Sequence, residues 1–410
     1  MKYVVLGSSA AGVNGVRELR KIDKNCEIIL ISKDEDIYSR CILHKYLCGE
    51  RDKKGISFVE DNFAELYGVN WIKGKACTGV HPDEKVVILE DGQKVSYDKL
   101  LIATGSHSFI PPIKGLKEAK NAIGFRNIDD IEVLKEVGKK CKHIIVMGSG
   151  LVGIDCATGF LEMGVKVTLV DMAGWLLNKQ LDQRAAQTYI DAFAAEGVEQ
   201  YYGVGVSEVL LDENQMITEV ILTDGTHLPC DYMVLTAGVR ANVEFLEGSG
   251  IETSRFGLIY DETGKTSDDN IYGAGDVSGM SPIWPVAVKE GMVAASNMAG
   301  VPRKMTDFFA SKSTMSFLGI HSMSLGDVNP VDDSYTIEIK ETNDYYKKIV
   351  HKDGKITGAL LQGDLAYGGV LQQLIARQID ITKVKKPIFD IDYSDFFRMK
   401  DNFEFFYEEN

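Results

Sequence analysis

The chain opens with a short apolar run that meets a loop bounded by glycines. Residues 3–6 are apolar, the loop extends from Gly7 to Gly12, and residues 13–22 carry apolar positions at helical spacing. A second apolar run follows at residues 28–31. This order of strand, loop, helix and strand predicts a βαβ unit of about 30 residues.

The same plan returns in the middle of the chain. Residues 143–147 are apolar, and the loop Gly148-Ser-Gly150-Leu-Val-Gly153 follows them. Residues 154–163 then predict a helix, and residues 166–170 predict a strand. Two such units predict an α/β chain with two doubly wound, Rossmann-like nucleotide-binding domains.

Each unit is followed by two strands separated by an Asp-Gly turn. In the first half, strands at residues 85–89 and 100–103 are predicted, and the second of them ends in Ala103-Thr104-Gly105. The matching strands in the second half, at residues 217–222 and 232–236, end in Ala237-Gly238.

The pattern changes after residue 302. Short alternating runs and one helical run then predict a third domain of α+β type. Its expected strands are residues 335–340, 345–350 and 355–361, and its expected helix is residues 369–379.

The second glycine loop has the residues that a dinucleotide needs. Gly148 permits a tight turn, Gly150 lets the backbone approach a pyrophosphate, and Gly153 lets the helix meet the strand. Asp171 ends the next strand, where a carboxylate accepts from the ribose 2′-hydroxyl and repels a 2′-phosphate. No arginine follows it directly, so the loop predicts NADH rather than NADPH.

The first loop departs from this pattern. Ser9 occupies the middle glycine position, and Ser32 stands where the acid that binds a ribose is usual. Asp34 and Glu35 are close by, and the sequence leaves open which of them reaches the ribose. Far downstream, Gly275-Asp276 follows an apolar run and can place a carboxylate at a ribityl chain.

The length, charge and cysteine content of the chain argue against several classes of protein. A chain of 410 residues is too long for one hydrophobic core, and a net charge of −15 without a basic stripe argues against nucleic acid. No apolar run approaches the ~20 residues that span a bilayer, and no signal peptide precedes the first strand. The cysteines form no C-x-x-C pair, which argues against a disulfide framework or a metal site. We therefore expect a cytoplasmic protein.

These pieces, in this order, resemble the FAD-dependent pyridine nucleotide–disulfide oxidoreductase superfamily over nearly the whole chain. The matching residues are Gly7 and Gly12, Ala103-Thr104-Gly105, Gly148-x-Gly150-x-x-Gly153, Ala237-Gly238 and Gly273-Ala274-Gly275-Asp276. The resemblance implies an FAD domain at residues 1–115 and 245–305, an NAD domain at residues 116–244, and an interface domain at residues 306–410.

Two segments resemble one branch of that superfamily. Residues 38–47 resemble a segment of ferredoxin and rubredoxin reductases, and residues 283–291 resemble the rubredoxin reductase and NADH–nitrite reductase branch. The resemblance implies that five side chains face FAD: Arg40, Lys45, Arg126, Asp276 and Glu290. It also pairs Lys45 with Asp155, so that a cation near the flavin N5 is kept charged by an acid.

Cys41 divides the functional interpretation. It stands where ferredoxin-type reductases carry proline, and where NADH oxidases and coenzyme A-disulfide reductases carry their single redox cysteine. Lys45 would lower the pKa of such a thiol. The alternative is a small side chain that only fills space. His44 could similarly be a proton donor or a structural residue.

We therefore expect FAD and NADH as cofactors and hydride transfer from NADH to the flavin. The acceptor is expected to be a rubredoxin- or ferredoxin-like protein or a partner redox subunit. The alternatives are a thiol-dependent oxidase or disulfide reductase acting through Cys41, and a non-catalytic flavin subunit. A homodimer or a place in a larger redox complex is possible. A basic cluster and an aromatic tail could dock a partner: Lys383, Lys385, Lys386, Arg398 and Lys400, and Phe396, Phe397, Phe403, Phe405, Phe406 and Tyr407.

Overall fold

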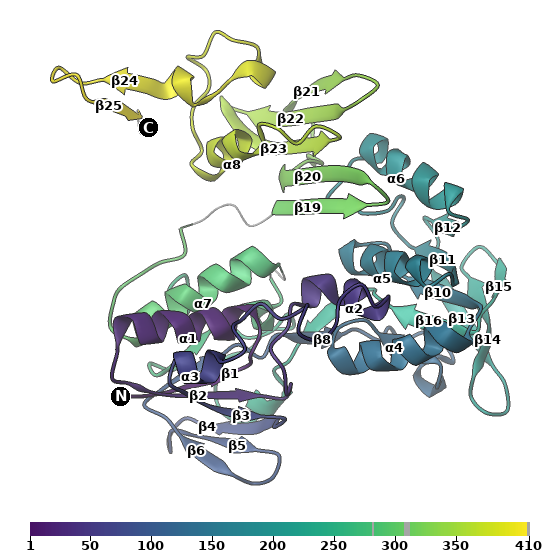
Figure 1. The fold of residues 1–410 in the computed structure, drawn as a ribbon, viewed down its shortest axis with the longest axis horizontal. Coiled ribbons are helices and arrows are strands. Elements are labelled where there is room, and N and C mark those ends of the chain that lie inside the picture. Colours follow the sequence, from purple (N-terminus) through teal and green to yellow (C-terminus); the bar gives the residue numbers. More distant parts are fainter. Residues whose placement is uncertain (281–282, 307–311, 408–410) are drawn as a thin grey trace. The chain divides into compact units, whose positions relative to one another are not determined.

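The computed structural model describes residues 1–280, 283–306 and 312–407, which form two compact units (Figure 1). The first unit comprises Met1–Gly148, Val152–Lys166 and Val206–Thr306. The second comprises Ser149–Leu151, Val167–Gly205 and Asp307–Asn410. The chain passes from one unit to the other within the second glycine loop.

The first unit is built around a parallel sheet in the order β18-β7-β1-β2-β3. Its strands are β1 (Lys2–Leu6), β2 (Glu27–Ser32), β3 (Val69–Lys73), β7 (Lys99–Ile102) and β18 (Ile271–Gly273). Helix α1 (Ala10–Ile22) connects β1 to β2. Because residues 3–6 of the central strand β1 are buried, they form an uninterrupted apolar run.

The two faces of this sheet are covered differently. Val5 and Leu30 belong to the core that β1 and β2 form with α1 and α7 (Trp284–Met298), which lie side by side in Figure 1. Val4 and Ile29 point to the other face and pack against a small antiparallel sheet. That sheet contains β4 (Cys77–His81), β5 (Val86–Leu89) and β6 (Lys94–Ser96).

The first unit also contains the start of the second nucleotide-binding region. Strand β10 pairs in parallel with β16, and β16 pairs in parallel with β9. The elements of this region are β9 (Ala122–Gly124), α4 (Ile128–Lys140), β10 (His143–Met147), α5 (Leu151–Glu162), β13 (Val206–Leu211), β14 (Ile217–Leu222), β15 (His227–Pro229) and β16 (Tyr232–Leu235). Shorter elements are α2 (Leu43–Leu47), α3 (Phe63–Leu66), and the antiparallel pair β8 (Ser106–Ser108) and β17 (Val239–Ala241).

The second unit combines a parallel strand pair with an antiparallel sheet. Strands β11 (Lys166–Asp171) and β12 (Glu199–Tyr202) flank α6 (Gln183–Ala195) in the chain. The antiparallel sheet has the order β19-β20-β23-β22-β21 and packs one face on α8 (Gly368–Ala376). Its strands are β19 (Lys312–Phe317), β20 (Ile320–Gly326), β21 (Thr336–Glu341), β22 (Tyr346–Lys352) and β23 (Lys355–Gln362). A hairpin of β24 (Phe397–Met399) and β25 (Phe405–Tyr407) follows.

Polar contacts join α6 to the antiparallel sheet within this unit. The Asp182 carboxylate caps α6 by accepting from Ala185 N at 2.9 Å. Its other oxygen accepts from Tyr346 Oη at 2.7 Å and from the buried Lys348 Nζ at 3.0 Å. About two turns along α6 from Asp182, Tyr189 Oη donates to the carbonyl oxygen of Ile320 at 3.0 Å. These buried polar groups therefore satisfy one another.

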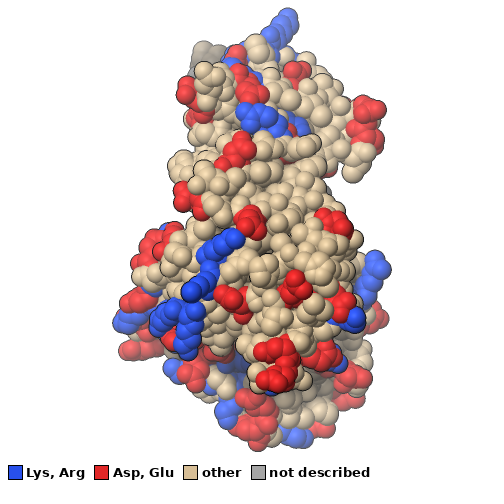
Figure 2. Space-filling model, turned by 90° about the vertical axis from the view of Figure 1, so that its right-hand side faces the viewer, with Lys and Arg blue, Asp and Glu red and all other residues tan. Residues whose placement is uncertain are grey.

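The α/β fold class with Rossmann-like parallel sheets and a C-terminal antiparallel sheet domain is confirmed. Within the described residues, no helix has the length and apolarity needed to cross a membrane. On the face drawn in Figure 2, acidic and basic side chains are interspersed. In the aromatic tail, Phe396 is buried and Phe403 is exposed, and the side chains of Phe405 and Tyr407 lie outside the described part.

Candidate functional site

The first glycine loop brings the ends of β1 and β7 into contact. Gly7 has a φ of +107°, and a Cβ added to it would overlap the carbonyl oxygen of Ala103. A Cβ on Gly12 would overlap the carbonyl oxygen of Gly7. Both positions therefore require glycine, because side chains there would drive the loop away from the sheet.

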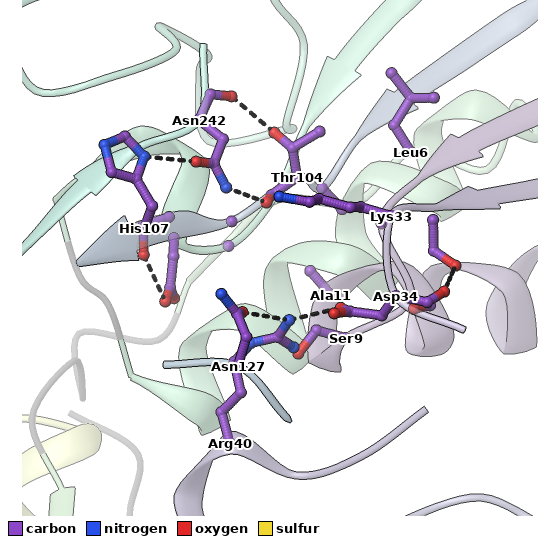
Figure 3. A pocket seen from close by; sticks show the side chains of 18 of the residues that line it. Leu6, Ser9, Ala11, Lys33, Asp34, Arg40, Thr104, His107, Asn127 and Asn242 are labelled. Carbon is purple, nitrogen blue, oxygen red and sulfur yellow. Dashed lines mark hydrogen bonds and ion pairs between the residues drawn. The ribbon is translucent and has the colours of Figure 1, made fainter. Parts of the chain in front are cut away.

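A cavity of about 600 Å³ lies beside this loop (Figure 3). Nine of the residues predicted to take part in the site line it: Gly7, Arg40, Cys41, Ala103, Thr104, Gly105, Arg126, Gly275 and Asp276. The predicted residues Gly12, Lys45 and Glu290 are not among the lining residues. The ends of strands that are far apart in the sequence thus meet in one site, as expected at the carboxyl edge of a parallel sheet.

One part of the cavity suits a diphosphate. Ser8 Oγ is buried and has no hydrogen-bond partner among the described residues. Ser9 is the N-cap of the 13-residue helix α1, and its side chain does not cap the helix. The first backbone N–H groups of α1 and the two hydroxyls can therefore bind an anionic group.

The sequence left open whether Asp34 or Glu35 reaches the ribose, and the hydrogen bonds around Ser32 and Asp34 bear on this choice. Ser32 Oγ accepts from Trp71 Nε1 at 2.9 Å and donates to the carbonyl oxygen of Asp34. The Asp34 carboxylate accepts from Arg40 Nη2 at 2.7 Å and from Tyr38 Oη at 3.0 Å. Asp34 lines the cavity and Glu35 does not, so Asp34 is the acid of the two that faces the cavity.

The Gly-Asp segment forms a second charged part of the cavity. Asp276 Oδ2 lies 2.5 Å from Arg126 Nη2, and both side chains are more than four-fifths buried. Arg126 Nη2 also donates to Ser106 Oγ at 2.8 Å. Glu290 lies behind this segment, accepts from Gly275 N at 2.7 Å, and has its pKa raised by burial. Glu290 thus supports the loop that carries Asp276.

Two residues of the cavity wall, Asn242 and His107, were not expected from the sequence. Asn242 Nδ2 donates to the carbonyl oxygen of Thr104 at 2.9 Å, and Thr104 Oγ1 donates to the carbonyl oxygen of Asn242 at 2.9 Å. Asn242 Oδ1 lies 2.7 Å from His107 Nδ1 (Figure 3). No motif marks Asn242 or His107, because the return of the chain after β16 brings them to the predicted residue Thr104.

The second glycine loop repeats the geometry of the first. Gly148 has a φ of +110°, and a Cβ on Gly153 would overlap the carbonyl oxygen of Gly148. A Cβ on Gly150 would meet nothing within 4 Å, so this position is open to an approaching group. Gly238 also has a positive φ, of +104°.

Asp171 stands at the end of β11, as predicted. Its Oδ2 accepts from Ser149 N at 2.5 Å and from Ser149 Oγ at 2.7 Å. Its Oδ1 accepts from Ala173 N at 2.8 Å. The carboxylate thus orders the loop that would hold a pyridine nucleotide, and its contact with a ribose stays a prediction.

Lys45 and Cys41 differ in their surroundings from what the motif suggests. Lys45 Nζ binds both carboxylate oxygens of Glu50, at 2.6 and 2.8 Å. Cys41 is exposed to the cavity, yet the protein around the thiol desolvates it and raises its pKa, to which the nearby Asp155 adds. The structure therefore does not provide the expected lowering of the thiol pKa by Lys45.

Asp155 is paired with a different residue. His44 directly precedes Lys45 in the chain, and its Nδ1 atom lies 3.2 Å from Asp155 Oδ1. The angle at this contact does not make it a hydrogen bond. The acid two residues beyond Gly153 therefore contacts His44, while Lys45 points to Glu50.

Two protein-family models match the chain. One, described as pyridine nucleotide-disulphide oxidoreductase, matches residues 1–291. The other, described as rubredoxin NAD+ reductase C-terminal domain, matches residues 313–379.

Curated relatives match over almost the whole chain. The NADH-dependent phenylglyoxylate dehydrogenase subunit epsilon of Aromatoleum evansii is 29% identical over 94% of this chain and 93% of its own. The assimilatory nitrate reductase electron transfer subunit of Bacillus subtilis is 29% identical over 95% of this chain, which spans 51% of that relative.

Solved structures show the same fold. The water-forming NADH oxidase of Lactobacillus brevis, bound to NADH, superimposes with a TM-score of 0.83 at 20% identity. That match covers 93% of this chain and 91% of the oxidase. With the two glycine loops and the cavity, these matches confirm the expected enzyme class and its cofactors. The chain therefore belongs to the pyridine nucleotide-disulphide oxidoreductase family and is an FAD- and NADH-dependent oxidoreductase.

Proposed function

We propose that the chain takes a hydride from NADH and delivers electrons to a redox centre held by a partner protein or subunit. One observation carries this proposal. The match to a rubredoxin NAD+ reductase C-terminal domain occupies the antiparallel-sheet domain, at residues 313–379. A relative that matches over nearly its full length is itself the subunit of an NADH-dependent dehydrogenase. We propose a cytoplasmic location for this assembly.

Different residues of the cavity are proposed to bind different parts of FAD. Ser8, Ser9 and the first turn of α1 would hold the diphosphate, and the Asp34–Arg40 pair would hold the ribose. The Arg126–Asp276 pair provides a fixed carboxylate that would bind the ribityl chain. When bound, FAD supplies the hydride-accepting and electron-passing chemistry. The protein supplies orientation and a partly desolvated, charged surrounding.

The pyridine nucleotide is held by the second loop. The open position at Gly150 admits the pyrophosphate, and Asp171 selects a free ribose 2′-hydroxyl. Lys45 and Asp155 remain proposed catalytic groups, each with its own observed partner. We also propose the three-domain division at residues 1–115 with 245–305, 116–244 and 306–410.

A thiol-dependent oxidase or disulfide reductase is the second candidate. It is favoured by one observation, the position of Cys41 in the wall of the cavity. The raised thiol pKa opposes it, because the thiolate is the reactive form.

An anaerobic NADH titration followed by stopped-flow mixing with acceptors separates the two candidates. We expect the reduced protein to be reoxidised rapidly by rubredoxin or ferredoxin and slowly by oxygen or coenzyme A disulfide. The variant Cys41→Ser should retain this pattern. Failure of every protein acceptor, together with loss of oxygen or disulfide turnover in Cys41→Ser, would transfer the assignment to the thiol route.

A further inference from the structure

The antiparallel sheet of the second unit ends in a fully exposed strand. Strand β21 (Thr336–Glu341) is the last in the order β19-β20-β23-β22-β21, and all six of its residues are exposed. Its inner edge pairs with β22. Among the strands that the structure describes, none pairs with its outer edge. That edge offers free backbone donors and acceptors to another strand.

The side chains of β21 separate by face. Ile337 and Ile339 share one face, and they are 45% and 55% exposed. Glu338 and Lys340 share the other face. Edge strands of monomeric proteins are usually protected by short length, charged side chains, bulges, proline or inward-pointing charges. Strand β21 carries charged side chains of both signs, so these can pair with the charges of a second copy as well as protect the edge. The register of β21 with β22 is regular over six residue pairs, and β21 contains no proline.

We propose that β21 pairs antiparallel with β21 of a second copy of this chain, in a register centred on Ile339. In that register each Glu338 stands opposite Lys340 of the other copy, which gives two opposite-charge pairs on one face. On the other face the two Ile339 side chains meet, and each Ile337 lies diagonal to Ile339 of the other copy.

Charge selects this register against its neighbours. Centring the pair on residue 338 would put Glu338 opposite Glu338, and centring it on residue 340 would put Lys340 opposite Lys340. Centring it between residues 339 and 340 would put Glu338 opposite Glu341. In the proposed register Glu341 faces Ile337, while its carboxylate is already bound by Arg184 of its own chain. Like charges directly opposite one another are destabilising, so the register centred on Ile339 is favoured over these three registers, and it alone among the four pairs Glu338 with Lys340.

Charge exchange tests the pairing in the FAD-loaded full chain. Sedimentation velocity over about 1 to about 100 µM should show a concentration-dependent dimer. Glu338→Lys alone and Lys340→Glu alone should each weaken dimerisation by at least about tenfold, because each change makes two like-charge pairs. The double variant with both changes should restore it. Glu213→Lys, at an exposed acid in the turn between β13 and β14, should leave it unchanged.

Backbone protection provides a second measurement. Hydrogen exchange in β21 should slow as concentration rises in the wild type and in the double variant, and should not do so in either single variant. A wild type that stays monomeric at the highest concentration would overturn the proposal. So would a dimer that either single charge change leaves intact, or one that the double exchange does not restore.

Discussion

His44 Nδ1 lies 3.2 Å from Asp155 Oδ1, and both side chains are more than four-fifths buried. Burial, and after it the charge of the neighbouring Lys45, lower the pKa of His44 to about 4. Burial raises the pKa of Asp155 well above its usual value. Gly159, one turn further along α5, lets α2 approach this closely, since an added Cβ there would lie 3.2 Å from the His44 carbonyl oxygen.

This pair predicts a specific dependence of stability on pH. His44 binds fewer protons folded than unfolded between its folded pKa of about 4 and its usual 6.5, so stability is lost as pH falls through that window. His44→Gln should remove up to about 3 kcal/mol of this loss. Melting temperatures at pH 7 and pH 5 measure it, and His81→Gln, at an exposed histidine, should change nothing.

Asp155 predicts a pH dependence of stability with the opposite sign to that of His44. Its folded pKa is raised, so the native state keeps a proton that the unfolded chain releases above about pH 4. Stability is therefore lost as pH rises from there, and Asp155→Asn should raise the melting temperature at pH 7 more than at pH 4. Equal effects at both pH values would contradict a neutral, buried carboxyl.

The two inner glycines of the second loop predict different defects. Gly150→Ala adds a methyl group to open space, so the protein should fold normally and lose affinity for NADH by about tenfold or more. Gly153→Ala forces the methyl group onto the Gly148 carbonyl oxygen and should lower the melting temperature itself. Melting curves and NAD+ titrations of the two variants check this. Normal NAD+ affinity in Gly150→Ala would show that the pyrophosphate lies elsewhere.

Arg126→Ala should release FAD and destabilise the protein. It leaves the mostly buried Asp276 carboxylate without its cation, a loss of about 3 to 5 kcal/mol for a buried pair. Flavin content after gel filtration and the melting temperature measure the two effects. The control is Lys114→Ala, because Lys114 is 76% exposed beside Glu208 and should cost under about 1 kcal/mol. Retention of FAD by Arg126→Ala would remove this pair from the site.

Asp171→Ala should reduce the preference for NAD+ over NADP+. The change removes the acceptor for Ser149 N and Oγ, so NAD+ should bind about tenfold more weakly or worse. NADP+ should lose less, because the repulsion of its 2′-phosphate disappears. Binding titrations with both nucleotides measure the ratio, and Glu213→Ala, at an exposed acid, should leave it constant. An unchanged ratio would show that Asp171 orders the loop without contacting the ribose.

The sequence identified the parts of the site that depend on backbone geometry. Gly7 and Gly153 are required because a Cβ would overlap a carbonyl oxygen, and such a requirement leaves a visible glycine pattern. The strands with clear alternation or apolar runs were also predictable, as β10 and β14 show. Strand β20 was missed because the buried serines Ser322 and Ser324 interrupt its apolar pattern, and strand β19 was missed because only two of its six residues are buried and apolar.

The sequence pattern does not show which side chains contact one another in the site. Neighbouring residues on a helix point about 100° apart, so a shift of one residue decides whether His44 or Lys45 faces α5. The 3-10 turn Arg40–Ile42 sets that rotation before α2 begins, and no periodicity reports it. Asn242 reaches Thr104 only through tertiary structure.

The Asp182 carboxylate makes the length of the chain matter to any fragment or chimera. Removing the strands after residue 312 would take Tyr346 and Lys348 away from it and uncover one side of α6. A pyridine nucleotide domain truncated at that point would therefore contain a destabilised helix α6. A chimera of two relatives should therefore take α6 and the C-terminal antiparallel sheet from the same protein.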